Sequence, residues 1–475
     1  MNEQLIAEVV REVMNQIGPV TSVITPSPTF QPSTTAPSEP GVFTDVESAV
    51  NSATESQQQL ERAGLEVRDG ICKLLKRMSR KNAQEWGRIE LEETKIGRLD
   101  HKILKLELLE QVPGVEYLKT HAHSGDQGIA LDEYAPFGVI GAITPVTHSI
   151  PTVTSNAISM IAAGNAIVFN PHPGGAQCAA MATAEYNRAI KREFNIDPPI
   201  NIINPPTLRT AEEIFRHKRI PLIVATGGPA VARAAMKQQK RAIVAGPGNP
   251  PVVVDETADF DNAARSIIEG GAFDNNLLCI GEKEVFVVES VFDQTMSAME
   301  RAGAVRLNAE QINRLTAVAF NHEKDHYAVN KDYLGKDTHV LATAAGAQCG
   351  PNVDLLFGET DESSPFVNEE QMMPFVPFVR VRDFEHGMAL AIKYEHGFGH
   401  TVCFHSNNLE RITRFGRACN TTLFVVNGPS SGALGAGGEG YCSYSIATPT
   451  GEGVTTPLSF ARFRRASVCG SLRIV

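Results

Sequence analysis

The sequence lacks the features that mark several classes of protein. Its eight cysteines include no Cys-x-x-Cys pair, which argues against a zinc ribbon or a disulfide scaffold and fits a reducing cytosol. No apolar run approaches the length of a membrane span, and Glu3, Glu8 and Glu12 interrupt any secretory signal. Basic residues are in deficit, with a formal net charge of -11 and a sequence pI of about 5.7. Nucleic acid is therefore not expected as the main partner, because phosphate binding needs an excess of Lys and Arg.

What the sequence contains is typical of a globular protein of two or three domains, with 42% hydrophobic residues in a chain of 475. Short apolar runs at 137–143, 166–169, 200–203 and 222–225 alternate with helical patterns. This alternation predicts the α/β class with a parallel sheet, which binds ligands at the carboxyl ends of its strands. A second α/β region is expected from about residue 246 to residue 427.

The first 41 residues have a different character. Residues 2–17 carry apolar side chains at three- and four-residue spacing, which predicts a short amphipathic helix that Gly18 and Pro19 end. Residues 18–41 are rich in Pro, Ser and Thr, a composition typical of a linker. So short a helix is marginal in water, and it either docks on its own chain or binds a partner. The linker favours a partner, since self-docking does not require one.

The most informative segment surrounds Cys279. The sequence 274–280 (DNNLLCI) places this cysteine between a small-residue segment, 270–273, and a strand-like run, 284–288. A cysteine on a loop between ordered elements, flanked by amide side chains, can be reached by solvent and activated as a thiolate nucleophile. These neighbours alone do not decide the matter, because a free cysteine is more often a small buried hydrophobe.

Two glycine-rich segments are candidate phosphate sites. Thr226, Gly227 and Gly228 follow a strand and open a helix, and backbone amides at a helix N-terminus can hold a pyrophosphate. An ordinary glycine turn explains that segment equally well. Residues 435–440 match the letters of the dinucleotide fingerprint, but no helical pattern follows them. A loop near the mouth of the active site is therefore favoured for the second segment.

Two histidine patterns have the spacing of metal ligands but lack the secondary structure and further ligands of a metal site. Residues 322–326 (HEKDH) match the zinc-protease pattern, yet they show no helical periodicity and no third ligand, which favours a solvated charged segment. His396, His400 and His405 are interpreted as incidental members of a helix-to-strand turn. No metal site is predicted.

Six segments carry a resemblance to a known family. They are 144–145 (TP), 169–173 (FNPHP), 226–228 (TGG), 245–251 (AGPGNPP), 273–279 (FDNNLLC) and 449–455 (PTGEGVT). In this order and spacing they resemble the CoA-acylating aldehyde dehydrogenases, and more narrowly the microcompartment enzymes of propanediol and ethanolamine utilisation. The resemblance covers about residues 42–465. It implies a Rossmann-type NAD-binding domain (42–245), an α/β catalytic domain (246–430), a β oligomerisation arm (431–475) and a homodimer or homotetramer.

By this resemblance Cys279 is the nucleophile. Its thiolate attacks an aldehyde, hydride passes to the nicotinamide of NAD, and the acyl group on Cys279 is transferred to the thiol of coenzyme A. The residues themselves support the last step. Hydrolytic relatives activate water with a glutamate in a Glu-Leu-Gly-Gly segment, whereas the matching stretch here, 245–249, has no carboxylate. Without a general base water competes poorly with a CoA thiol, which ionises far more readily.

The resemblance also implies a set of cofactor-binding residues, namely Thr144, Pro145, His172, Thr226, Gly227, Gly228 and Glu370. Glu370 matches the glutamate that binds the nicotinamide ribose. His172 stands where hydrolytic relatives have a lysine, which leaves the choice between NAD and NADP open. The oxyanion is expected at the Cys279 amide and one side-chain donor, and His148 occupies the position of the relatives' asparagine.

Together these features predict the oxidation of a short-chain aldehyde, propionaldehyde first and acetaldehyde second, to its acyl-CoA. The resemblance makes residues 1–17 an encapsulation peptide that binds a shell protein or a co-encapsulated enzyme, inside a bacterial microcompartment in the cytoplasm. Two alternatives remain open: a hydrolytic dehydrogenase that releases the free acid, and a non-catalytic scaffold that gathers enzymes through residues 2–17. A zinc protease is a more distant third.

Overall fold

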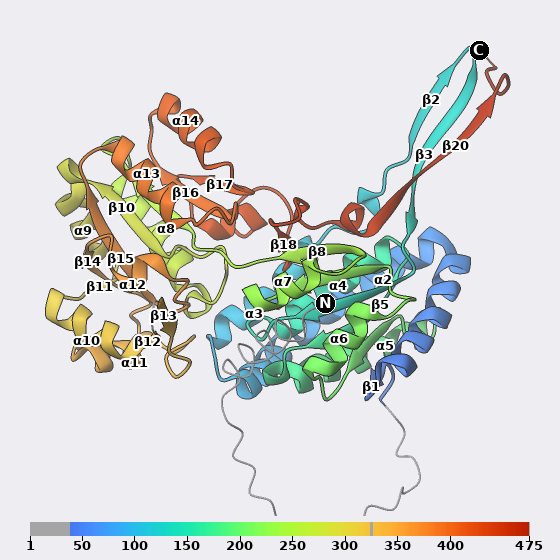
Figure 1. Cartoon of the computed structure of the whole chain (residues 1–475), viewed down its shortest axis with the longest axis horizontal. Coiled ribbons are helices and arrows are strands. Elements are labelled where there is room, and N and C mark those ends of the chain that lie inside the picture. Colours follow the sequence, from blue (N-terminus) through green and yellow to red (C-terminus); the bar gives the residue numbers. More distant parts are fainter. Residues whose placement is uncertain (1–38, 324–325, 475) are drawn as a thin grey trace, which may run out of the picture.

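The computed structural model describes residues 39–323 and 326–474, which form two lobes and a projecting β ribbon (Figure 1). Each lobe is built on its own parallel sheet. The amphipathic helix predicted at 2–17 and nearly all of the linker lie outside the described residues. Within the described part of the chain, no helix is both long enough and apolar enough to cross a bilayer.

The first lobe contains a six-stranded parallel sheet in the order β1-β6-β5-β4-β7-β8. Its strands are β1 (Val42–Phe43), β4 (Val139–Thr144), β5 (Ala166–Pro171), β6 (Ile200–Ile203), β7 (Leu222–Thr226) and β8 (Arg241–Ala245). After β6 the chain returns to the opposite side of β4, so the strand order reverses between β4 and β7. Ligands of open α/β sheets bind at such a reversal, beyond the carboxyl ends of the strands.

The helices of this lobe are α2 (Val46–Thr94), α3 (Leu99–Glu107), α4 (Ser149–Ala162), α5 (Ala176–Phe194), α6 (Leu208–Arg216) and α7 (Pro229–Met236). Asp45 begins α2 by accepting a hydrogen bond from the Ser48 amide at 2.8 Å. Gly64 breaks the long helix with a φ of 82°, a conformation that glycine adopts without steric cost. The break lets two straight segments cover one sheet.

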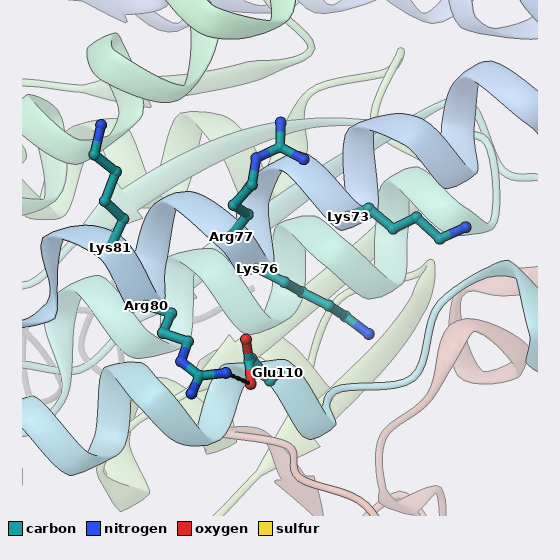
Figure 2. A pocket seen from close by; sticks show the side chains of 6 residues that line it. All are labelled: Lys73, Lys76, Arg77, Arg80, Lys81 and Glu110. Atoms are coloured by element: carbon teal, nitrogen blue, oxygen red, sulfur yellow. Dashed lines mark hydrogen bonds and ion pairs between the residues drawn. The ribbon is translucent and has the colours of Figure 1, made fainter.

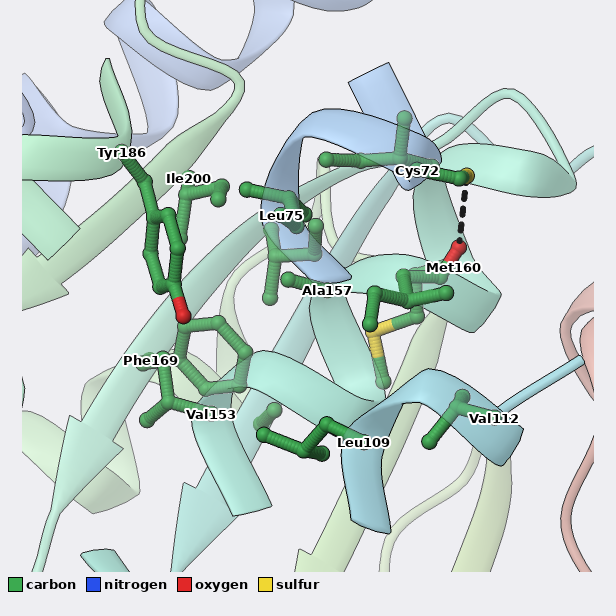
Figure 3. Close-up of a cluster of buried hydrophobic side chains, with 14 of the residues drawn as sticks. Cys72, Leu75, Leu109, Val112, Val153, Ala157, Met160, Phe169, Tyr186 and Ile200 are labelled. Carbon is green, nitrogen blue, oxygen red and sulfur yellow. Dashed lines mark hydrogen bonds between the residues drawn. The ribbon is translucent and has the colours of Figure 1, made fainter. Parts of the chain in front are cut away.

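The core of the first lobe lies where α2, α4 and α5 pack together and against the sheet (Figure 3). Leu75, Phe169 and Tyr186 are fully buried there. Cys72 belongs to this cluster, with its thiol 3.4 Å from the carbonyl oxygen of Ile158, and burial raises the pKa of that thiol to about 12. Cys72 is therefore a packing residue rather than a reactive one.

The second lobe contains a seven-stranded parallel sheet in the order β11-β14-β15-β10-β9-β16-β17. Its strands are β9 (Pro251–Val254), β10 (Glu284–Val288), β11 (Val305–Arg306), β14 (Leu356–Thr360), β15 (Phe375–Val381), β16 (Thr401–His405) and β17 (Leu423–Val426). Its helices are α8 (Phe260–Ala272), α9 (Phe292–Arg301), α10 (Ala309–Ala319), α11 (Thr338–Ala345), α12 (Pro365–Asn368), α13 (Phe384–Tyr394) and α14 (Leu409–Cys419). The central strands β9, β10 and β15 are almost wholly apolar, as a sheet covered on both faces requires.

The zinc-protease pattern at 322–326 falls on a hairpin of this lobe. Strands β12 (Phe320–Glu323) and β13 (His326–Val329) pair antiparallel, and residues 324–325 between them lie outside the described chain. The pattern needs two imidazoles one helical turn apart, and the strands on either side of it do not provide that helix.

The projecting ribbon is a three-stranded antiparallel sheet in the order β2-β3-β20, comprising β2 (His121–Gly125), β3 (Gly128–Pro136) and β20 (Ala461–Cys469). The predicted arm at 431–475 supplies only β20, and the short strands β18 (Ile446–Ala447) and β19 (Gly453–Val454) pair with each other. Arg465 joins β20 to β3 through bonds of 2.5 and 2.8 Å to Asp132. The hairpin was missed in the sequence because β2 is polar and exposed, so it lacks an alternating pattern.

Candidate active site

Cys279 lies on an irregular loop that α8 and β10 hold at its two ends. The short helix η4 (Phe273–Asn276) directly follows α8, and within it Asp274, Asn275 and Asn276 take φ values of 50°, 57° and 64°. Asp and Asn tolerate this left-handed region better than other non-glycine residues, because their short side chains bond locally. The left-handed backbone of this turn therefore explains why Asp and Asn residues precede Cys279 in the sequence.

Buried polar contacts hold these three residues. The Asn275 amide group donates to the Gly335 carbonyl and to Asp337, both at 2.9 Å. The Asn276 amide group donates to the carbonyls of Gly271 at 2.7 Å and Glu282 at 2.9 Å. Because every strained residue is tied to the surrounding structure, the loop presents Cys279 in one conformation.

Asp274 connects the loop to the first lobe. Its carboxylate lies 2.5 Å from Nζ of Lys105 on α3, and the neighbouring Lys102 pairs with Glu90 of α2 at 3.2 Å. All four side chains are at most 1% exposed. The Asp274 amide also donates to Nδ1 of His101 at 2.8 Å. The nucleophile loop is therefore anchored on both lobes.

The Cys279 thiol is half-buried and forms no disulfide. Burial and the Glu370 carboxylate raise its pKa to about 12, while the Lys283 ammonium and the amides of Cys279 and Ile280 act in the opposite direction. A pKa this high favours the protonated thiol at neutral pH, so thiolate formation depends on positive charge close to the sulfur.

The backbone of Gly248 lies against this loop. A Cβ on Gly248 would stand 2.5 Å from the carbonyl oxygen of Cys279 and 3.0 Å from the ring of His400. His400 is fully buried, its Nε2 has no hydrogen-bond partner among the described residues, and burial lowers its pKa to about 4. It lies in the turn between α13 and β16, as the sequence indicated, and the fold places its neutral imidazole beside the nucleophile loop. Only tertiary contacts distinguish it from His396, which bonds the Asn368 carbonyl at 2.8 Å.

Glu370 lies near the same loop, although it is far away in sequence. Burial raises the pKa of its half-buried carboxyl to about 7, against the effects of Lys283 and the Gly248 amide. It is the carboxylate whose charge acts on Cys279. The predicted ribose ligand and the predicted nucleophile thus lie within electrostatic reach of each other.

The other predicted cofactor residues gather at the carboxyl edge of the first sheet. Thr144 and Pro145 end β4, His172 follows β5 with its amide bonded to the Thr144 carbonyl at 2.9 Å, and Thr226 ends β7. The Thr144 hydroxyl is buried and has no partner. A Cβ on Gly227 or Gly228 would meet no atom within 4 Å, so the backbone before α7 faces open space. This edge is where the strand order reverses, and it fits a dinucleotide pyrophosphate.

Comparison with known proteins decides the family. The model of the aldehyde dehydrogenase family matches residues 21–444. The chain belongs to the aldehyde dehydrogenase family. The predicted fold class and the predicted enzyme class, an aldehyde dehydrogenase, are confirmed. The acetylating acetaldehyde dehydrogenase EutE of Salmonella typhimurium is 40% identical over 479 residues, covering 100% of both chains.

Two solved structures of aldehyde dehydrogenases share the fold. The propionaldehyde dehydrogenase of Rhodopseudomonas palustris with bound propionyl-CoA is 37% identical, with a TM-score of 0.89 over 92% of this chain and 96% of that one. The propionaldehyde dehydrogenase of the Clostridium phytofermentans fucose utilisation microcompartment is 39% identical, with a TM-score of 0.89 over 92% and 100%.

In this aldehyde dehydrogenase no hydrogen bond joins His148 to Cys279 among the described residues. It precedes α4, its Nε2 lies 3.2 Å from the Thr147 hydroxyl, and its ring packs 5.6 Å from that of Tyr444. Its Nδ1 has no partner, and burial and the Lys105 charge lower its pKa well below the usual value. A neutral imidazole can still donate a hydrogen bond, so its role as oxyanion donor stays a prediction.

A basic surface hollow on α2 lies apart from these residues (Figure 2). Its volume is about 780 Å³, and its lining residues are Lys73, Lys76, Arg77, Arg80, Lys81 and Glu110. Three of its cations already form ion pairs, with Asp69, Glu193 and Glu110. This pairing weakens its field, and the acyl-transfer chemistry does not require it.

Proposed function

We propose that this aldehyde dehydrogenase oxidises a short-chain aldehyde, propionaldehyde first and acetaldehyde second, to the acyl-CoA with NAD+ inside a bacterial microcompartment. The CoA-acylating activity and the use of NAD and coenzyme A agree with the relatives named above. The observation that carries the proposal is the stretch 245–249, which lies against the Cys279 loop at Gly248 and has no carboxylate to match the glutamate of hydrolytic relatives.

The described residues support the following sequence of bonds. The Cys279 sulfur bonds to the aldehyde carbon, and the carbonyl oxygen gains the negative charge, which the Cys279 amide and the predicted His148 donor stabilise. Glu370 and the turn at 226–228 would hold NAD, which would supply the oxidising chemistry, and the acyl group would remain on the Cys279 sulfur as a thioester. The sulfur of CoA then bonds to the acyl carbon, and the Cys279 sulfur leaves and regains a proton. The sum is aldehyde, NAD+ and CoA giving acyl-CoA, NADH and a proton.

The release step follows from the groups near the thioester. Gly246 and Gly248 carry no base, and the buried imidazole of His400 is a weak base because burial lowers its pKa to about 4. Water would therefore need a base that stands next to it, whereas the CoA thiol is already acidic enough to ionise in part near neutral pH. Glu370 is the carboxylate of interest at this step, because its charge acts on Cys279.

Product analysis tests this assignment. With aldehyde and NAD+, sustained NADH formation is expected only when CoA is present, and acyl-CoA should match NADH in amount. Cys279→Ala should abolish both. Equal amounts of free acid without CoA would instead establish the hydrolytic alternative, and aldehyde-dependent NADH formation by Cys279→Ala would overturn the role of Cys279.

The relatives support both propionaldehyde and acetaldehyde as the substrate. The two structures compared above are propionaldehyde enzymes, whereas EutE, which covers the whole chain, acts on acetaldehyde. A scan of aldehydes from two to four carbons at saturating CoA is the decisive measurement. We expect the highest kcat/KM for propionaldehyde, and a maximum at acetaldehyde would reverse the order.

The microcompartment setting and the oligomer are further parts of the proposal. A relative from a fucose utilisation microcompartment supports the setting, and the tethered segment at residues 1–41 suits a shell or core protein as partner. The ribbon β2-β3-β20 projects away from both lobes, as an arm that reaches another subunit would (Figure 1). Sedimentation should give a homodimer or homotetramer, and removal of 461–475 should yield smaller species.

A further inference from the structure

Lys283 is a buried lysine that holds the loop carrying Cys279. Its Nζ donates to the backbone oxygen of Asn276 at 2.7 Å and to that of Leu278 at 3.2 Å, and a third bond reaches the side-chain oxygen of Asn276. Leu278 immediately precedes Cys279. Two of the three bonds therefore fix the backbone directly before the nucleophile.

The three acceptors require the ammonium form of Lys283. An ammonium offers three N–H donors, whereas a neutral amine offers two and would turn a lone pair towards an oxygen. The side chain is 0% exposed, and burial lowers its pKa to about 8. The hydrogen bonds oppose that effect of burial, so a positive charge is kept inside the protein next to the nucleophile loop.

Among the described residues no carboxylate forms an ion pair with Lys283. The two other buried lysines differ in this respect, since Lys102 pairs with Glu90 at 3.2 Å and Lys105 pairs with Asp274 at 2.5 Å. A buried charge without an adjacent counter-ion is costly, because it has lost its hydration. The three oxygens that accept from Lys283 and the more distant Glu370 carboxylate offset part of this cost.

The Cys279 thiol lies between two opposing influences. The Lys283 charge favours the thiolate, and the Glu370 charge disfavours it. Glu370 also acts on Lys283, so the three groups share one local field. A thiolate on Cys279 would be a further anion in the field of Lys283, beside the Glu370 carboxylate.

Resting on the proposed role of Cys279 as nucleophile, we propose that Lys283 is a positioning residue that fixes the Cys279 loop and supplies the positive field in which the thiolate forms. It acts through Cys279 and has no contact with the aldehyde in this account. Loss of its charge should lower kcat much more than it changes the KM for the aldehyde or for NAD+.

The test compares the rates at which iodoacetate and iodoacetamide alkylate Cys279 in the full chain without cofactor. Both reagents attack the same thiolate, so the fraction of thiolate and its accessibility affect both rates equally and drop out of their ratio. Iodoacetate is an anion and iodoacetamide is neutral, so the ratio of the two rates reports the electrostatic potential at the Cys279 sulfur. Lys283→Gln keeps a donor but loses the charge, and the iodoacetate-to-iodoacetamide ratio should fall about tenfold. Lys283→Arg keeps the charge, and its ratio should stay within about threefold of the parent.

Lys240→Gln is the matched control. Lys240 also donates to two backbone carbonyls, those of His217 at 2.9 Å and Ile220 at 3.0 Å, but it lies in the first lobe before β8. Its loss should leave the ratio at Cys279 unchanged. A fall as large as that in Lys283→Gln would show a general effect of losing a capping lysine and would overturn the proposal.

Glu370 also favours the charged form of Lys283, so Glu370→Gln is measured at acidic pH, where Lys283 keeps its charge, and it gives a result even where Lys283→Gln does not fold. Removal of the opposing carboxylate should raise the ratio about tenfold. An unchanged ratio in folded Lys283→Gln or in Glu370→Gln overturns the role of Lys283. Cys279→Ala distinguishes failure of this proposal from failure of the proposed function. If Cys279→Ala forms NADH from the aldehyde, the proposed function is wrong. If Cys279→Ala is inactive and the alkylation ratios do not change in the other variants, only the proposal for Lys283 is wrong.

Discussion

Gly248 and Cys279 touch through their backbones, so closely that a Cβ on Gly248 would stand 2.5 Å from the Cys279 carbonyl oxygen. The contact joins the segment between β8 and β9 to the loop before β10, and these segments are about 30 residues apart in the sequence. It explains why the residue at position 248 has no side chain. The fit of the nucleophile loop depends on this contact.

We therefore expect Gly248→Ala to displace the Cys279 loop. A Cβ at 2.5 Å from a backbone oxygen cannot be accommodated without movement, and the His400 ring blocks the other side at 3.0 Å. Because a small misplacement of a reacting group can cost about 100-fold, kcat/KM should fall by about that factor while the protein stays folded. Gly350→Ala is the control, since a Cβ there meets nothing within 4 Å. Similar kinetics in both variants would contradict the importance of the contact.

The buried pair of Lys105 and Asp274 should dominate stability at this junction. Lys105→Met removes the 2.5 Å partner of the buried Asp274 carboxylate and leaves it Lys102 at 3.8 Å and the Arg98 amide at 2.8 Å, so a loss of about 3 kcal/mol in the free energy of unfolding is expected. Chemical denaturation followed by circular dichroism measures it. Lys73→Met breaks the exposed pair with Asp69 and should leave the unfolding midpoint unchanged. If both variants unfolded at the parent midpoint, the anchoring of the loop on α3 would be refuted.

His405 should make the fold sensitive to acid. Both of its ring nitrogens lack partners, and burial lowers its pKa from 6.5 to about 4. Its contribution to stability is therefore complete above pH 6.5 and is lost as the pH falls towards 4. The loss amounts to about 3 kcal/mol for a shift of this size. In His405→Leu the free energy of unfolding should decline less over this range than in the parent.

Glu282 should give stability the opposite dependence on pH. Burial raises the pKa of this carboxyl from 4.5 to about 7, although Ser430 bonds to both of its oxygens at 2.8 Å. Its contribution is complete below pH 4.5 and is lost as the pH rises through 7. Glu282→Gln should therefore gain stability relative to the parent between these values. Parallel pH curves for the parent and both variants would disprove the two assignments.

Deletion of residues 1–40 should separate catalysis from placement. Turnover in solution should be unchanged, whereas co-localisation with shell proteins should be abolished, because the predicted amphipathic helix and its linker are removed together. Fluorescence imaging of tagged full-length and truncated chains alongside a shell protein gives the readout. A loss of turnover on deletion would instead indicate that the helix docks on its own chain.

Parts of the active site were predictable because they depend on local sequence. The strands 139–144, 166–171, 200–203 and 222–226 are recognisable as short apolar runs, and their parallel pairing places the segments that follow them at one edge. Thr144, His172 and Thr226 meet there for that reason. The projecting ribbon was not predictable in the same way, since β2 and β3 become a sheet with β20 only through pairing across more than 300 residues of chain.

The sequence by itself determined the family, the α/β class and Cys279 as the candidate nucleophile, because those depend on motif order and on periodicity along the chain. Only the tertiary structure decided what surrounds the sulfur. Gly248, Lys283, Glu370 and His400 come from separate segments, and the roles of a buried cation, a half-buried carboxylate and a neutral imidazole depend on desolvation and on partners across space. The surroundings of His148, the predicted oxyanion donor, also depend on the tertiary structure. Its ring packs against that of Tyr444, which is far away in the sequence.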